Sequence, residues 1–174
     1  MPELYVSWSE YHRLIEELAA QIYQSGWEFN QIVCIAKGGL RVGDILCRLF
    51  DRPLAILAAA SYRGEGNRQR GEIVFSEHLS LVGDLGDRLL LVDDLADSGI
   101  SLRESVRWLQ DHYGDHLHDC RTAVLWYKGC SVVQPDYFVT YLPDNPWIHQ
   151  PFEYYERVSP AEVAARYTRL SSRP

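Results

Sequence analysis

Hydrophobic and polar positions follow two periods along the chain, one typical of helices and one typical of buried strands. Residues 7–22 carry apolar side chains at helical spacing behind a capping-box pattern that runs from Ser7 to Glu10. Residues 39–50 and residues 101–113 repeat the helical spacing. All three segments are therefore predicted to be helices with one buried face.

Short apolar runs without helical spacing lie between and after these segments. We predict buried strands at residues 31–36, 53–60, 88–92, 121–127 and 137–142. Strands that alternate with helices indicate an α/β fold with a mostly parallel central sheet flanked by helices. Ligands of such folds bind at the carboxyl ends of the strands, so the residues that follow each strand are the candidates for chemistry.

Composition narrows the class of protein. The chain has 174 residues, a length that suits one domain, and a net charge of −7, which argues against a nucleic-acid binder. The longest apolar run, residues 54–60, is too short to span a bilayer, and the first residues lack the pattern of a signal peptide. The four cysteines form no CxxC pair. We therefore expect reduced thiols, a cytoplasmic location and no integral membrane association.

Acids, hydroxyls and a glycine are concentrated after the third predicted strand. Asp93 and Asp94 follow that strand directly, and residues 97–101 lead into the next helix. The first N–H groups of a helix have no partners inside it and favour a phosphate, while Gly99 lets the backbone approach a ligand. Neighbouring carboxylates suit two sugar hydroxyls, with a divalent cation able to share them. The pattern predicts a sugar 5-phosphate site; the alternative is an acidic loop with an N-cap.

A second phosphate-binding segment follows the first strand. Ala36, Lys37, Gly38 and Gly39 combine exposed backbone N–H groups with a positive charge, which suits a pyrophosphate. The segment lacks the GxxxxGK[ST] pattern of a P-loop. A glycine-rich turn without a ligand is the alternative.

Residues 61–75 carry arginines among glycines. Arg63, Arg68 and Arg70 would make this loop cationic and mobile, able to close over a pyrophosphate and exclude water. A solvated hairpin is the alternative.

The end of the chain offers groups for an aromatic base. Lys128 follows a predicted strand and can donate to a carbonyl group, while Trp147 can stack on a ring. A solvated lysine and a packed tryptophan are the alternatives. His112 and His116 have the spacing of a helical metal pair, but a glycine between them is predicted to end the helix, which favours a solvated loop.

The segment LLLVDDLADSGIS, residues 89–101, resembles the signature of type I phosphoribosyltransferases, which bind 5-phosphoribosyl-1-pyrophosphate (PRPP). The resemblance implies that Asp93 and Asp94 hold the ribose hydroxyls and that Asp97 manages a proton at purine N7. It further implies a 5-phosphate loop made of Asp97, Ser98, Gly99, Ile100 and Ser101. The resemblance covers roughly residues 5–153.

Other segments resemble the 6-oxopurine branch of that family. By this resemblance the peptide between Ala36 and Lys37 in the pyrophosphate loop can be cis. A flexible loop would begin with the pair Ser61 and Tyr62. The run WIHQPFE, residues 147–153, is similar to the bacterial xanthine–guanine branch.

The same resemblance assigns the base pocket. It implies that Lys128 meets the purine 6-oxygen, that Trp147 stacks on the base, and that the Ile148 carbonyl accepts from a 2-amino group. Two residues depart from the branch, since Lys37 replaces a common arginine and His149 replaces an acid.

The resemblance implies a transferase of purine salvage with Mg²⁺ near Asp94, Asp93 and Glu153. Glu153 stands where an aspartate is usual, so its role near the metal is open. A single domain over residues 1–174 is expected, with a small hood for the base and a helical tail over residues 154–174. A homodimer or homotetramer is expected. Transfer to another base such as orotate, and a PRPP-sensing regulator, remain alternatives.

Overall fold

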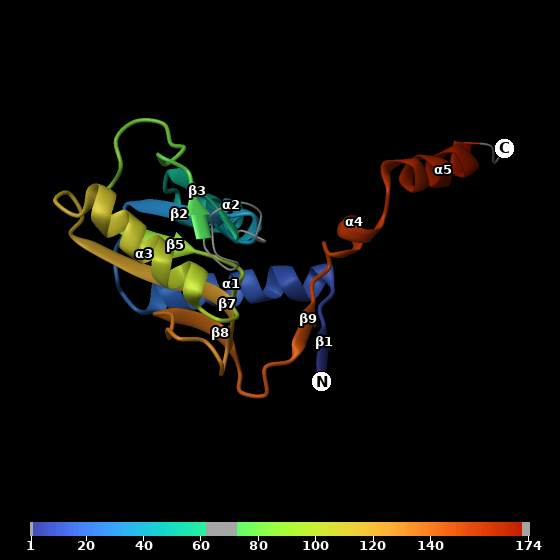
Figure 1. Ribbon diagram of the computed structural model, residues 1–174, viewed down its shortest axis with the longest axis horizontal. Helices are drawn as coiled ribbons and strands as arrows, with labels where there is room; N and C mark the ends of the chain where they lie inside the picture. Colours follow the sequence, from blue (N-terminus) through green and yellow to red (C-terminus); the bar gives the residue numbers. More distant parts are fainter. Residues whose placement is uncertain (1, 62–72, 172–174) are drawn as a thin grey trace, which may run out of the picture. The chain divides into compact units, whose positions relative to one another are not determined.

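The structure is a computed structural model that describes residues 2–61 and 73–171. The chain forms two compact units, one from Arg13 to Asn145 and the other from Met1–His12 together with Pro146–Pro174 (Figure 1). We describe the larger unit first, because it holds the sheet.

Seven strands form the sheet of the larger unit, in the order β4-β3-β2-β5-β7-β6 with β8 also paired to β7. The pairing of β3 with β4 is antiparallel and the other pairings of the described strands are parallel. This confirms the predicted mostly parallel sheet. The strands are β2 (Gln31–Ala36), β3 (Leu54–Ser61), β4 (Ile73–Phe75), β5 (Arg88–Val92), β6 (Leu95–Ala96), β7 (Asp119–Lys128) and β8 (Tyr137–Leu142).

Helices α2 (Gly39–Phe50) and α3 (Ile100–Tyr113) connect neighbouring strands in opposite directions. The chain passes from β2 through α2 to β3 on one side, and from β5 through α3 to β7 on the other. Because such crossovers are right-handed, the two helices cover opposite faces of the sheet. Figure 1 shows α3 lying across β5 and β7. The carboxyl ends of β2 and β5 therefore meet at the point where the strand order reverses, the usual ligand crevice of these folds.

Side-chain packing agrees with this two-faced arrangement. Val33 and Ile35 belong to the same buried cluster as Leu102 and Leu109 of α3. Cys34 points to the other face, where a β-carbon added to Gly43 of α2 would lie 1.9 Å from its Sγ atom. Alternate residues of β2 thus bury against different helices, which is why this strand is apolar from Ile32 to Ala36.

The smaller unit pairs β1 (Glu3–Tyr5) with β9 (Trp147–His149) in parallel. Helix α4 (Tyr154–Arg157) and helix α5 (Pro160–Ser171) follow. Ser159 and Glu162 form a reciprocal capping box at the start of α5, with Pro160 at its first position. Helix α1 (Trp8–Gln24) begins in this unit and continues in the larger one.

The long elements predicted within the larger unit are confirmed, including the end of α3 at Tyr113. In the predicted tail over residues 154–174 the structure has two helices, α4 and α5, and residues 172–174 lie outside the described part of the chain. The short elements β1, β4, β6 and β9 were not predicted. Over residues 2–61 and 73–171, every helix is too short or too polar to cross a membrane.

Candidate functional site

The glycines after β2 lie against the acids after β5. A β-carbon added to Gly38 would lie 2.4 Å from Asp94 Oδ1 and 2.6 Å from Asp93 Oδ1. One added to Gly39 would lie 2.2 Å from the backbone oxygen of Val92. Only glycine fits this close approach, so the sequence of the loop is fixed by its contact with the acid pair. The preceding peptide bond, between Ala36 and Lys37, is cis.

A hollow of about 200 Å³ opens at this junction. It collects residues from three strand ends and from the first turn of α3, all within the larger unit. Its lining consists of Ile35, Ala36, Lys37, Gly38, Ala59, Ala60, Ile73, Asp93, Asp94 and Ser101. The predicted pyrophosphate segment and the predicted ribose acids therefore face one cavity.

Burial in this crevice perturbs the acid pair. Desolvation raises the pKa of the Asp93 carboxyl well above its ordinary value, and the adjacent charge of Asp94 raises it further. Asp93 Oδ1 also accepts a hydrogen bond of 2.9 Å from the Asp94 backbone N–H. The pair stores unfavourable charge that a cation or a set of hydroxyl donors would relieve.

The predicted phosphate loop is held from outside by the segment that follows β7. Gly99 has a φ of 73°, and a β-carbon there would lie 2.2 Å from Ser131 Oγ. The Val132 backbone N–H donates to the Ser98 carbonyl at 2.9 Å. A glycine is thus required at the point where the loop turns into α3.

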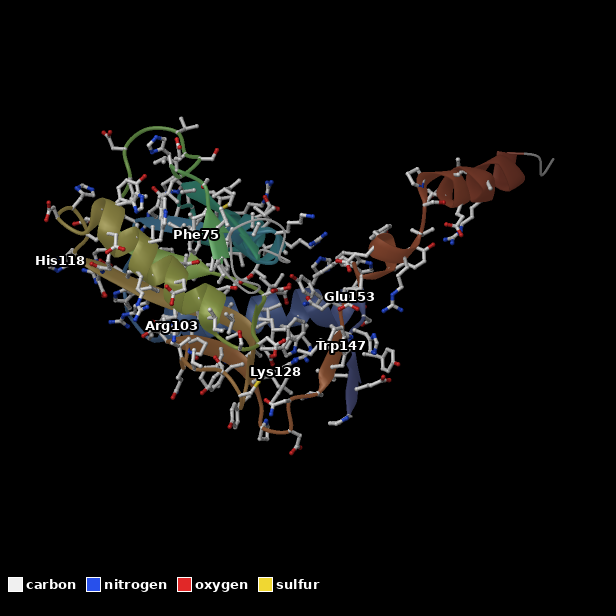
Figure 2. The ribbon with its side chains drawn as sticks, viewed as in Figure 1. Phe75, Arg103, His118, Lys128, Trp147 and Glu153 are labelled. Atoms are coloured by element: carbon white, nitrogen blue, oxygen red, sulfur yellow. The ribbon has the colours of Figure 1, made fainter. Side chains whose placement is uncertain are left out.

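Lys128 and Asp97 meet beside this loop. Lys128 ends β7, and its Nζ lies 3.1 Å from Asp97 Oδ1 (Figure 2 labels Lys128). The lysine side chain is 7 % exposed and the aspartate side chain 58 % exposed. A nearly buried ammonium and an accessible carboxylate therefore stand side by side. Lys37, by contrast, is exposed.

Trp147 and Ile148 belong to the smaller unit, on β9, where Figure 2 labels the tryptophan. The Trp147 backbone N–H donates to the Pro2 carbonyl, and the His149 carbonyl accepts from the Val6 backbone N–H. In this parallel ladder alternate residues face the partner strand, so the N–H and C=O of Ile148 point to the other edge. No further strand of the described chain pairs there. Ile148 is 5 % exposed, and the predicted role of its carbonyl stays a prediction.

Glu153 also belongs to the smaller unit. Its Oε2 lies 3.8 Å from His149 Nδ1 and 3.9 Å from an Arg157 nitrogen. His149 stacks on Tyr5 with ring centroids 4.3 Å apart. These contacts explain how an imidazole is accommodated here, while the metal role of Glu153 stays a prediction.

The predicted flexible loop is only partly within the described residues. Ser61 ends β3, whereas Tyr62, Arg63, Arg68 and Arg70 lie outside the part of the chain that the structure describes.

Two features of the site carried no recognisable sequence signal. Ala59 and Ala60 line the cavity through their position at the end of β3. Ser131 and Val132 contact the phosphate loop only because β7 returns the chain to it. The fold, and not local sequence, brings these residues to the site.

The fold and the site define a phosphoribosyltransferase. The profile of the phosphoribosyl transferase domain matches residues 7–157, and the chain belongs to this family. A xanthine-guanine phosphoribosyltransferase of Gluconobacter oxydans is 33 % identical over 153 residues, covering 85 % of this chain and 83 % of the relative. Its namesake from Idiomarina loihiensis is 28 % identical over 152 residues, covering 87 % of each chain.

Solved structures agree. The Helicobacter pylori xanthine-guanine-hypoxanthine phosphoribosyltransferase has a TM-score of 0.74 and 25 % identity, over 89 % of this chain and 96 % of that chain. A purine phosphoribosyltransferase of Pyrococcus horikoshii has a TM-score of 0.71 and 28 % identity, over 87 % of this chain and 95 % of that chain. The family and fold predicted from the sequence are confirmed.

Proposed function

We propose that the chain transfers the 5-phosphoribosyl group of PRPP to a 6-oxopurine, giving a purine nucleoside 5′-monophosphate and pyrophosphate in purine salvage. The acceptor class comprises hypoxanthine, guanine and xanthine. The observation that carries the proposal is the Lys128–Asp97 pair, whose aspartate belongs to the predicted phosphate loop that follows the acid pair in the sequence. The names of the relatives point to the same acceptors.

Each half of PRPP has a candidate binding segment. The first turn of α3 with Ser101, together with Ser98 just before the helix, suits the 5-phosphate. Asp93 and Asp94 suit the ribose hydroxyls, and the residues 36–39 suit the pyrophosphate. Ser101, the acid pair and part of the segment 36–39 line the same crevice, so one extended ligand can contact all three.

Mg²⁺ fits this donor set. In the described residues no group of three or more His, Cys, Asp or Glu side chains could hold a metal. Magnesium is commonly bound by one or two carboxylates together with substrate phosphates, and the adjacent carboxylates of half-buried Asp93 and buried Asp94 match that mode. When bound, the ion would neutralise charge on the pyrophosphate.

The spacing of Lys128 and Asp97 matches one edge of a 6-oxopurine. Atoms O6 and N7 are neighbours on that edge, and O6 accepts hydrogen bonds. Lys128 Nζ, 3.1 Å from Asp97 Oδ1, can donate to O6, while the Asp97 carboxylate can accept from N7–H in the tautomer of the free base that carries its proton there. Adenine presents an amino donor instead of O6, which would face the ammonium without an acceptor.

The chain's own groups then account for the transfer. The bond from ribose C1 to pyrophosphate breaks, the leaving oxygen keeps the electron pair, and N9 forms the new bond to C1. The loop of residues 36–39 stabilises charge on the departing group. Lys128 holds the base in line, and Asp97 accepts the proton that leaves N7 as N9 bonds to C1. The stacking role of Trp147 stays a prediction.

A nucleotide-formation assay tests the proposal. The full chain would be incubated with PRPP, Mg²⁺ and, separately, hypoxanthine, guanine, xanthine, adenine and orotate. We expect turnover with the first two, equal or weaker turnover with xanthine, and little with adenine. A preference for orotate or adenine would refute the base assignment, and PRPP binding without any turnover would indicate a regulator. Cytoplasmic location and assembly as a homodimer or homotetramer stay predictions.

A further inference from the structure

Asn145 adopts an unusual backbone conformation at the end of the larger unit. Its φ is 49°, in the left-handed region, although it is not glycine and precedes a proline. Asparagine tolerates this region better than most residues, yet the residue before a proline normally favours an extended conformation. Such a conformation persists where surrounding contacts determine it.

The contacts of Asn145 join two turns. Its side-chain Oδ1 accepts a hydrogen bond of 2.9 Å from the Cys130 backbone N–H. Its own N–H donates to the Leu142 carbonyl at 3.3 Å, and the same carbonyl accepts the Gly129 N–H at 3.0 Å. The turn after β8 is thereby tied to the turn after β7.

The tied turn belongs to the site. It begins at Lys128, whose carbonyl accepts the Ser131 N–H at 3.1 Å. Its next residue, Val132, donates to Ser98 of the phosphate loop, and the Cys130 thiol lies 3.5 Å from the Asp97 carbonyl. The turn therefore lies between the lysine at the end of β7 and the loop that carries Asp97.

We propose that Asn145 is a positioning residue that, through the Cys130 N–H, holds the turn 128–132 and so fixes Lys128 relative to Asp97 for base binding. The inference rests on the proposed function, because it assumes that this pair meets the purine. The side chain acts through its acceptor oxygen, and the left-handed backbone aims that oxygen at the turn.

Two substitutions distinguish the contribution of the Asn145 Oδ1 atom from that of the left-handed backbone conformation. Asn145→Gly keeps easy access to positive φ and removes the acceptor. Asn145→Asp keeps an acceptor and a residue type that tolerates the left-handed region. Asp51→Gly is the matched control, since Asp51 is the other non-glycine residue with positive φ in the described chain and caps α2 instead.

Steady-state kinetics, melting temperature and amide exchange would be measured for each variant. We expect Asn145→Gly to raise the KM for hypoxanthine about 2- to 12-fold, the effect of one lost hydrogen bond, and to change the KM for PRPP less. Exchange of the Cys130 amide should become faster. Asn145→Asp keeps an acceptor, so its KM for hypoxanthine should stay within about threefold of the wild-type value.

Three results would overturn the proposal: an unchanged hypoxanthine KM in Asn145→Gly, equal damage in Asn145→Asp, or the same rise in Asp51→Gly. A rise of both KM values in parallel with a lower melting temperature would also overturn it, since that is the effect of general destabilisation. Failure of the proposed function is distinguishable, because the unsubstituted chain would then make no purine nucleotide.

Discussion

Replacing Lys128 with methionine tests how the base is read. The substitution removes the ammonium 3.1 Å from Asp97 Oδ1 and keeps an unbranched side chain in a site where the lysine is only 7 % exposed. Methionine fills irregular apolar space well. The change therefore removes a charge and leaves the packing largely intact.

The stability effect should be small. Asp97 is 58 % exposed, so water can solvate its carboxylate after the lysine is lost. Pairs with an exposed partner contribute about 0–1 kcal/mol, and a buried ion can be replaced by an apolar residue at little cost. For a chain of this size, about 1 kcal/mol corresponds to a shift of about 2–4 °C in Tm.

The catalytic effect should be larger. A hydrogen bond to a charged group contributes about 1.5–3 kcal/mol, so kcat/KM for hypoxanthine should fall about 10- to 150-fold. Adenine gains nothing from the ammonium, so its kcat/KM should not fall in parallel, and the preference for the oxopurine should narrow.

The assay compares hypoxanthine with adenine at saturating PRPP. Arg48→Met is a suitable control, because it removes a positive charge from an exposed ion pair with Asp44 on α2. The reasoning is refuted if Lys128→Met retains the wild-type kcat/KM for hypoxanthine, or if both bases lose the same factor.

Three further substitutions probe the crevice. Gly38→Ala places a methyl group within 2.6 Å of both Asp93 and Asp94. Because overpacking costs about 1–3 kcal/mol, PRPP binding should weaken about 5- to 150-fold. Unchanged PRPP affinity by calorimetry would contradict this crowding. Asp97→Asn should lower kcat about 100-fold or more with PRPP affinity kept, whereas full turnover would exclude proton handling. Burial raises the pKa of Asp93 in the folded state, so native protein retains a proton that the unfolded chain releases. The free energy of unfolding therefore falls as pH rises from about 4 through the raised pKa. Asp93→Asn should then raise Tm above the wild-type value near neutral pH, and the difference in Tm should vanish toward about pH 4 in thermal melts. A difference in Tm that does not change with pH would contradict the raised pKa of Asp93 as its cause.

The sequence predicted the long elements because their patterns are local. The buried faces of α2 and α3 and the continuous apolar runs of β2 and β5 each follow from burial within one element. β1 and β9, at three residues each, carry too few positions for a period to emerge, and they form only because they pair with each other across the chain.

Within the site, the acids and glycines were predictable and their mutual contacts were not. The α/β pattern implies that the carboxyl ends of the two strands at the reversal of strand order lie close together. The contact of Gly99 with Ser131, and the tie from Asn145 to Cys130, depend on how two turns meet after the sheet has formed. Such pairings leave no periodic trace in either segment.

The placement of the two lysines has a practical consequence for covalent chemistry. Lys37 and Lys128 are the only lysines in the sequence. Lys37 follows β2 and lines the crevice, whereas Lys128 ends β7 beside Asp97. Lys37 is exposed and Lys128 buried. An amine-reactive label therefore has one accessible side chain to modify, and that side chain lies in the predicted pyrophosphate loop. Acylation of Lys37, followed by the mass of the peptide that contains it, becomes a reporter of ligand occupancy in this protein without any engineered handle.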